Sequence, residues 1–170
     1  MTLQLAGPIA AREDTPLGDA CAIDRTMQMV GNRTAMLLLR ETFYGASRFD
    51  HLVKRVGVTE AVASQRLREL VDIGVLAKEP YREPGQRTRY EYVLTESGHA
   101  LLPTLLAMLD WGETYHPYGH RRPTRAVHAE CGETVRPMLR CEAGHDVAEE
   151  DVVITTYPRT KSTQSTAKRP

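Results

Sequence analysis

The residues with the clearest potential for chemistry lie on one face of a helix predicted between Gly57 and Leu70. Side chains three and four positions apart share a helix face, so Ala63, Leu67 and Leu70 are expected to point inward. The outward row is polar near the start of the helix and comprises Glu60, Ala61, Ser64, Gln65 and Arg68. A helix fits the major groove of DNA, where Gln can pair with adenine and Arg with guanine or a phosphate. The row therefore predicts a DNA-reading helix, with an ordinary solvated face as the alternative.

A basic hairpin is predicted directly after this helix. Two strands are expected at 75–80 and 88–94, with the turn at Pro84 and Gly85. Cationic side chains at the tip could lie along phosphates or enter the minor groove, and an ordinary charged hairpin is the alternative. The complete set of predicted DNA-contacting residues is Ser47, Arg48, Thr59, Glu60, Ala61, Ser64, Gln65, Arg66, Arg68, Arg82, Gln86, Arg87, Thr88 and Arg89.

A second group has the residue types that bind zinc. His128 and Cys131 form one pair, and Cys141 and His145 form another, with nine residues between the pairs. Two such pairs suit tetrahedral Zn²⁺, which can stabilise a module too small for its own core. A structural zinc site is therefore predicted here, and a catalytic one is disfavoured because no nearby general base is evident. The alternatives are a metal-free β-hairpin module and a Cys131–Cys141 disulfide, which a reducing cytosol disfavours.

Three helices are predicted before the DNA-reading helix. Apolar residues at helical spacing place them at 19–30, 33–43 and 47–56. The third is expected to begin with a capping box formed by Ser47 and Asp50. Gly57 permits the tight turn that follows, and Thr59 can cap the DNA-reading helix.

A long helix is predicted after the hairpin. Thr95 is expected to cap it, a leucine stripe runs along it to about Tyr115, and Pro103 should kink it. The fold class predicted from this order is mainly α with a small β wing. It is a winged helix-turn-helix, with a small β-rich module at the C-terminal end.

The chain is expected to divide into five parts. They are an N-terminal arm at 1–18, the winged domain at 19–116, a linker at 117–125, a small module at 126–156 and a disordered basic tail at 157–170. The formal net charge of zero hides an uneven distribution. Residues 54–91 carry eight Lys or Arg against six Asp or Glu, whereas residues 128–151 carry two against seven. The weakly basic middle is the part that favours a nucleic-acid partner.

Several function classes are disfavoured by the sequence. The longest apolar run, 35–39, is far below the roughly 18–20 residues that a membrane span needs. The start of the chain lacks the pattern of a secretory signal, and three cysteines do not make a disulfide framework, so a cytoplasmic protein is expected. Because no phosphate-binding glycine loop, nucleophile elbow or metalloprotease motif appears, we predict that the protein is not an enzyme.

The chain from Cys21 to Trp111 resembles a known family. The resemblance is carried by 37–41 (LLLRE), 48–50 (RFD), 65–70 (QRLREL), 74–76 (GVL), Tyr81, Pro84, 89–92 (RYEY), 94–95 (LT), Gly98, 102–103 (LP) and Trp111. This pattern is similar to the HxlR-type winged helix-turn-helix regulators, which are relatives of the MarR group. One departure is Thr34, where the family usually has tryptophan.

The resemblance implies a transcriptional regulator that binds double-stranded operator DNA as a homodimer and needs no cofactor to do so. Such proteins dimerise through the N-terminal segment and the long C-terminal helix. Two half-sites would then lie about one helical turn apart on a near-palindrome.

The resemblance also bears on the cysteines. Some family members sense oxidants through a cysteine placed like Cys21, although a small buried hydrophobe is the simpler interpretation. A subset of the family carries a zinc-ribbon-like extension, but Gly144 stands where its fourth ligand cysteine would be, with His145 beside it. Two further alternatives are a protein-interaction module that uses the winged fold as a scaffold, and a ligand-responsive regulator with its pocket between the long helix and the DNA-binding part.

Overall fold

The computed structural model describes residues 2–82, 85, 87–119 and 123–156. The chain forms two compact units, which are described separately. The larger is Gly18–Pro137, and the smaller combines Met1–Leu17 with Met138–Pro170. The segment 126–156, expected to be one module, is divided between them, and the predicted domain bounds stay predictions. The predicted disordered tail, 157–170, lies outside the described residues.

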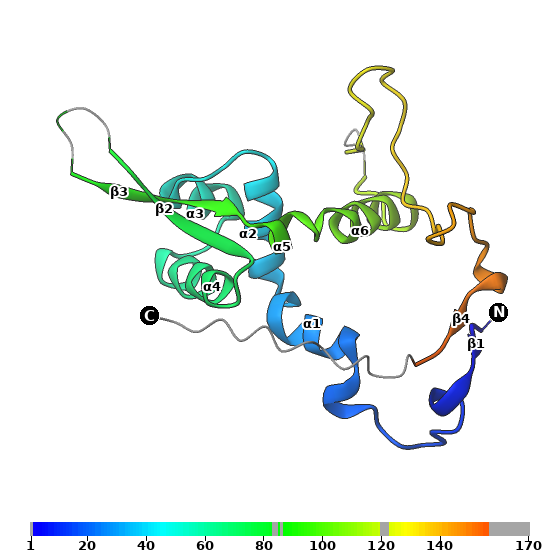
Figure 1. The fold of residues 1–170 in the computed structure, drawn as a ribbon. Coiled ribbons are helices and arrows are strands. Elements are labelled where there is room, and N and C mark those ends of the chain that lie inside the picture. Colours follow the sequence, from blue (N-terminus) through cyan, green and yellow to red (C-terminus); the bar gives the residue numbers. More distant parts are fainter. Residues whose placement is uncertain (1, 83–84, 86, 120–122, 157–170) are drawn as a thin grey trace. The chain divides into compact units, whose positions relative to one another are not determined.

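The larger unit is mainly helical with one small sheet, as predicted (Figure 1). The helices before the hairpin are η2 (Gly18–Ala20), α1 (Ala22–Val30), α2 (Arg33–Phe43), α3 (Phe49–Val56) and α4 (Glu60–Asp72). The hairpin consists of β2 (Leu76–Tyr81) and β3 (Arg89–Leu94), and α5 (Glu96–His99) and α6 (Leu102–Tyr115) follow it. The two strands pair antiparallel, from Leu76 opposite Leu94 to Tyr81 opposite Arg89. This order is that of a winged helix-turn-helix.

Local signals explain where α2 and α4 begin and where α3 and α4 end. The Asn32 side chain accepts hydrogen bonds from the first turn of α2, and Thr59 Oγ1 accepts one from Val62 N at 3.4 Å. These bonds satisfy backbone N–H groups that have no partner inside a helix. Gly57, with φ 71°, ends α3, and Gly74, with φ 73°, follows α4. The predicted Thr59 cap and the turn at Gly57 are confirmed.

The predicted capping box at the start of α3 is wrong. The helix begins at Phe49, and Arg48 occupies the cap position without a side-chain hydrogen bond to the first turn. The Ser47 hydroxyl instead donates to Glu91 Oε2 at 2.7 Å, and Ser47 O accepts from Tyr92 N at 2.8 Å. Ser47 therefore joins the start of α3 to β3 of the hairpin.

The single long helix predicted after the hairpin is also wrong, because two helices replace it. Thr95 caps the short α5, where its Oγ1 accepts from Gly98 N at 3.2 Å and donates to Gly74 O at 2.6 Å. Pro103 lies in the first turn of α6. A proline there costs no backbone hydrogen bond, so it begins a helix and kinks none.

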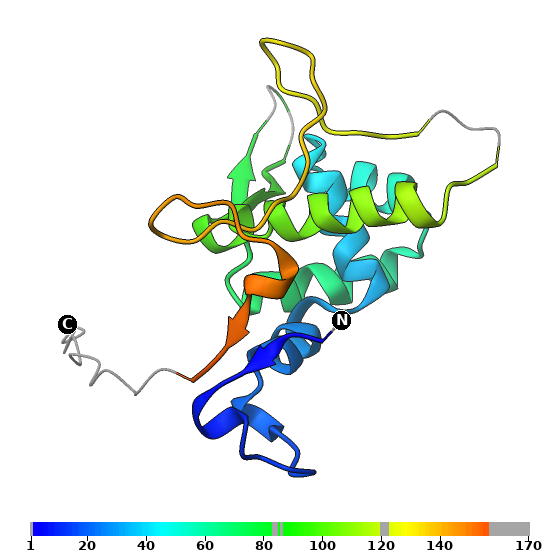
Figure 2. The same cartoon turned by 90° about the vertical axis from the view of Figure 1, so that its right-hand side faces the viewer.

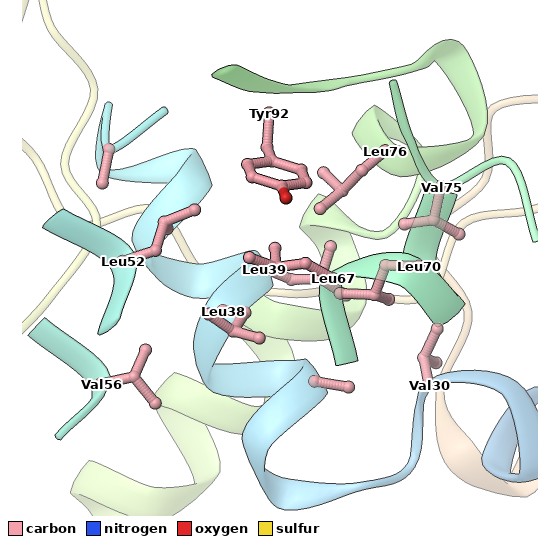
Figure 3. Packing of buried hydrophobic residues seen from close by; sticks show 12 residues of the cluster. Val30, Leu38, Leu39, Leu52, Val56, Leu67, Leu70, Val75, Leu76 and Tyr92 are labelled. Carbon is pink, nitrogen blue, oxygen red and sulfur yellow. The ribbon is translucent and has the colours of Figure 1, made fainter. Parts of the chain in front are cut away.

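A leucine-rich core joins the helices to the hairpin (Figure 3). The largest fully buried side chains come from α2, α3, α4 and β2, and they are Leu38, Leu39, Leu52, Leu67, Leu70 and Leu76. One charged residue, Glu41, is buried beside this core. Its carboxylate lies 2.6 Å from Arg40 Nη2 and 3.7 Å from Arg55 Nη1, which supplies the pairing that a buried charge needs.

The smaller unit holds little regular structure in its described residues, 2–17 and 138–156. Strand β1 (Gln4–Leu5) pairs in parallel with β4 (Val153–Ile154), drawn as dark blue and orange arrows in Figure 2. The short helices η1 (Gly7–Ile9) and η3 (Glu149–Asp151) and a bridge between Arg140 and Asp146 complete it. A β-rich C-terminal module therefore stays a prediction.

Gly98 and Gly112 give a matched test of how α5 packs. A Cβ at Gly98 would lie 2.3 Å from Val75 O, whereas one at Gly112 in α6 would meet nothing within 4 Å. We expect Gly98→Ala to lower the free energy of unfolding by about 1–3 kcal/mol through overpacking. Gly112→Ala should raise it by about 0.5–1 kcal/mol, the usual helix preference. Urea denaturation of both variants measures this, and equal effects would contradict the packing described here.

Candidate nucleic-acid interface

Helix α4 presents a polar face opposite a buried one. Ala63 and Leu67 are fully buried, and Leu70 is 1% exposed. The helical repeat then turns the predicted polar row away from the core. Glu60, Ala61, Gln65 and Arg68 are exposed, and Ser64 and Arg66 are half-buried. The row therefore has the geometry expected of a helix that reads a groove.

Four side chains on this face form a continuous hydrogen-bonded network. Gln65 Nε2 donates to Glu69 Oε1 at 2.8 Å, and Arg66 Nη1 donates to Glu69 Oε2 at 2.5 Å. Arg68 Nη2 donates to Gln65 Oε1 at 2.8 Å. The hydrogen bonds from Gln65 and then Arg66 lower the pKa of Glu69. Glu69 is absent from the predicted site. The sequence did hold a signal for it, because Glu69 follows Gln65 by four residues and Arg66 by three, and side chains at these spacings are neighbours on a helix.

The hairpin places cations beside aromatic rings. Lys78 Nζ lies 4.5 Å from the centroid of the Tyr90 ring, and the Arg48 guanidinium lies 4.8 Å from that of Tyr81. Such cation–π contacts restrict long side chains and leave their charge available. Sequence reasoning missed Lys78 and Tyr90 as candidate contacts, because both lie in the strands and outside the turn.

The strands extend beyond the helices, as Figure 1 shows. Of the predicted hairpin contacts, Arg82, Arg87, Thr88 and Arg89 are exposed. Gln86 and Pro84 lie outside the described residues. Ser47 and Arg48 lie beside the middle of β3, where Arg48 forms an isolated antiparallel β-bridge with Glu91. The structure thus gathers two candidate contact groups, one on α4 and one on the hairpin.

Two helices carry apolar side chains that the described chain leaves exposed. On α1, Ile23 is 77% exposed and Met27 is 57% exposed. On α6, Met108, Trp111 and Tyr115 are more than half exposed, and the helix has no buried residue within the described part of the chain. A cavity of about 270 Å³ lies between α2 and α6, lined mainly by apolar residues such as Leu37, Phe43 and Leu105.

The redox role predicted for Cys21 and the zinc site predicted around Cys131 and Cys141 stay predictions. Cys21 is half-buried at the cap position of α1, and its Sγ accepts a hydrogen bond from Asp24 N at 3.4 Å. His128 Nδ1 lies 3.3 Å from Cys131 Sγ in the larger unit, whereas Cys141 and His145 belong to the smaller unit. Among the described residues, no three His, Cys, Asp or Glu side chains gather as a metal site.

No helix in the described part of the chain is long and apolar enough to cross a membrane.

Comparisons with known proteins agree with this geometry. Residues 29–120 match the family model described as HxlR-like helix-turn-helix. An HTH-type transcriptional regulator of Mycobacterium tuberculosis is 33% identical over 142 residues, which cover 83% of this chain and 89% of the relative.

Solved structures are similar as well. The crystal structure of the transcription-factor candidate PA1607 has a TM-score of 0.70 and 30% identity, and the match covers 85% of this chain and 98% of that one. The oxidised form of the redox regulator HypR has a TM-score of 0.51 and 29% identity, covering 55% of this chain and 96% of that one. The family match spans α2, the hairpin and α6, so the elements that form the candidate interface are those the relatives share. This protein is a transcriptional regulator of the helix-turn-helix type and belongs to the HxlR-like helix-turn-helix family.

Proposed function

We propose that the protein binds operator DNA as a homodimer, with α4 in the major groove and the hairpin on the flanking backbone. The observation that carries the proposal is the exposed polar face of α4 opposite a fully buried one. Gln65 can pair with adenine, and Arg68 can pair with guanine. Binding to chromosomal DNA is also the reason that we expect the protein in the cytoplasm.

The hairpin cations suit contacts that position the protein without reading bases. Arg87, just before β3, and Arg89, the first residue of β3, are exposed. Lys78 is restricted by its contact with the Tyr90 ring. Phosphate contacts of this kind supply affinity and register, whereas base contacts supply specificity. The proposal therefore assigns different roles to α4 and to the hairpin.

A second copy of the chain is the partner that the apolar surfaces favour. Helix α6 is rich in apolar residues but has no buried residue within the described part of the chain, whereas apolar helix surfaces are normally covered. In the described chain its residues Met108, Trp111 and Tyr115 stay exposed, and α1 adds Ile23 and Met27. Covering these side chains would remove large apolar areas from water, which is the main favourable term in protein association. A twofold dimer would place two copies of α4 about one DNA turn apart.

Substitution of Arg68 and of Arg87 should separate base reading from backbone contact. We expect Arg68→Ala to weaken binding to the operator by about 10-fold or more, and binding to random DNA by much less. Arg87→Ala should weaken binding to both DNAs similarly and should reduce the slope of log affinity against log salt concentration by about one. The operator is first selected from a randomised duplex library, and affinities are then measured by fluorescence anisotropy at several salt concentrations. Equal binding of the wild-type chain to all sequences would contradict the proposal.

Substitution of Trp111 should test the dimer. We expect the wild-type chain to be a dimer at micromolar concentration, and Trp111→Ser to raise the dimer dissociation constant by at least about 30-fold, as a central aromatic contact does. Tyr118→Ser is the control, because Tyr118 is exposed but lies beyond the end of α6. Sedimentation equilibrium measures the constants. A monomeric wild-type chain, or equal effects of the two substitutions, would rule out this role for α6.

A further inference from the structure

We infer that Glu69 is a positioning residue that holds Gln65 and Arg68 ready for base recognition and thereby sets how sharply the protein discriminates among DNA sequences. The inference rests on the proposed function, because it concerns the same face of α4. Glu69 itself need not touch DNA. It acts through the two residues assigned to the bases.

The network fixes one orientation of the Gln65 amide. Its Nε2 donates to the Glu69 carboxylate and its Oε1 accepts from the Arg68 guanidinium, both at 2.8 Å. Turning the amide by half a rotation would place its oxygen against the carboxylate and its NH₂ group against the guanidinium. Both contacts would then be repulsive, since a carboxylate only accepts hydrogen bonds and a guanidinium only donates them. Glu69 and Arg68 therefore select a single amide orientation before DNA arrives.

The donor and the acceptor that the Gln65 amide has left over match the edge of adenine. A glutamine amide has two N–H donors and two acceptor lone pairs, and the network uses one of each. One donor and one acceptor are left on neighbouring atoms. Adenine presents the N7 acceptor and the N6 donor in the major groove, so these groups can pair without breaking the network. An amide that is already oriented loses less conformational freedom on binding.

The Glu69 charge also bears on binding to random DNA. Its carboxylate accepts from Arg66 Nη1 at 2.5 Å, which offsets one of the cations on α4. A glutamate is ionised at neutral pH, and the hydrogen bonds from Gln65 and Arg66 lower the pKa of Glu69 further. Sequence-independent affinity grows with the number of cations free to pair with phosphates. Glu69 therefore lowers the affinity for random DNA while it supports base recognition by Gln65.

This role differs from a contribution to stability. The Glu69 side chain is 40% exposed and its partners lie three and four residues away on the same helix. Exposed ion pairs of this kind contribute little to folding stability. Loss of Glu69 should consequently change sequence discrimination while the melting temperature stays nearly constant.

The test compares Glu69→Ala with Asp72→Ala. Asp72 is an exposed acid at the end of the same helix, so its removal changes the net charge equally but leaves the network intact. A randomised duplex library first gives the wild-type operator, and Gln65→Ala then identifies the adenine that Gln65 reads. Affinities are measured for the operator and for a copy with that adenine replaced, together with the melting temperature of each variant.

We expect Glu69→Ala to reduce the preference for this adenine by about 10-fold, within the range that one bidentate pair supplies, and to strengthen binding to random DNA. Asp72→Ala should keep the wild-type preference. An unchanged preference in Glu69→Ala, or an equal loss in Asp72→Ala, would overturn the inference and leave the proposed function standing. A wild-type chain that selects no sequence would overturn both.

A measurement without DNA tests the same network. The side-chain amide resonances of Gln65 in the free protein should shift as Glu69 is titrated, with a midpoint below the ordinary pKa of glutamate. The Asp72→Ala variant should show the same shift, and Glu69→Ala should abolish it. Resonances that do not respond to the ionisation of Glu69 would show that the two side chains are not bonded in solution, which contradicts the inference.

Discussion

Burial of one face of α4 is the constraint on which the rest of the structure depends. Leu67 and Leu70 pack into the leucine-rich core with residues of α2, α3 and β2 (Figure 3). Ala63, on the same face of α4, is also fully buried. Burying a leucine side chain contributes roughly 1.5–3 kcal/mol, so rotation of the helix about its axis would be strongly opposed. Because the inner face is held, the outer face is aimed in one direction. The outward direction of Gln65 and Arg68 is therefore set by the buried residues on the opposite face of α4.

The hairpin is held to the helices by specific polar bonds as well as by packing. Ser47 joins the start of α3 to Glu91 and Tyr92 of β3, and Thr95 joins the end of β3 to Gly74 after α4. These bonds tie the middle of β3 and its C-terminal end to the segments beside it. The positions of Lys78 and Arg89 relative to α4 are therefore set by the fold, as two surfaces that share one DNA duplex would require.

Local sequence signals predicted the elements whose ends are decided locally. The start of α2 was predicted correctly because Asn32 caps the helix within its own first turn, and α4 was predicted to start near Thr59 for the same reason. The capping box at Ser47 failed because its hydroxyl bonds to Glu91, which lies 44 residues away in the chain. No short-range pattern reveals that a better partner exists elsewhere.

The same distinction explains the other differences. The break between α5 and α6 is an exception, because its signal is local: Pro103 in the first turn of α6 begins a new helix, whereas the leucine periodicity alone predicts an unbroken one. In the candidate site, exposure of the polar row on α4 followed from periodicity alone. The orientation of Gln65 did not, because it depends on which rotamers Glu69 and Arg68 adopt together. The cation–π contact of Lys78 likewise depends on the register of β2 against β3.

Charge places a final limit on how this protein can recognise a polyanion. The whole chain has a formal net charge of zero, and residues 54–91 carry eight cations against six acids. Under the proposed function, the small excess of cations gives only a weak general attraction to phosphates, so affinity would depend mainly on oriented contacts. An acid beside the reading residues would be a disadvantage to a protein that relied on bulk attraction. In a nearly neutral protein the proposed role makes it useful, because Glu69 orders Gln65 through a hydrogen bond while its charge would weaken binding to every other sequence.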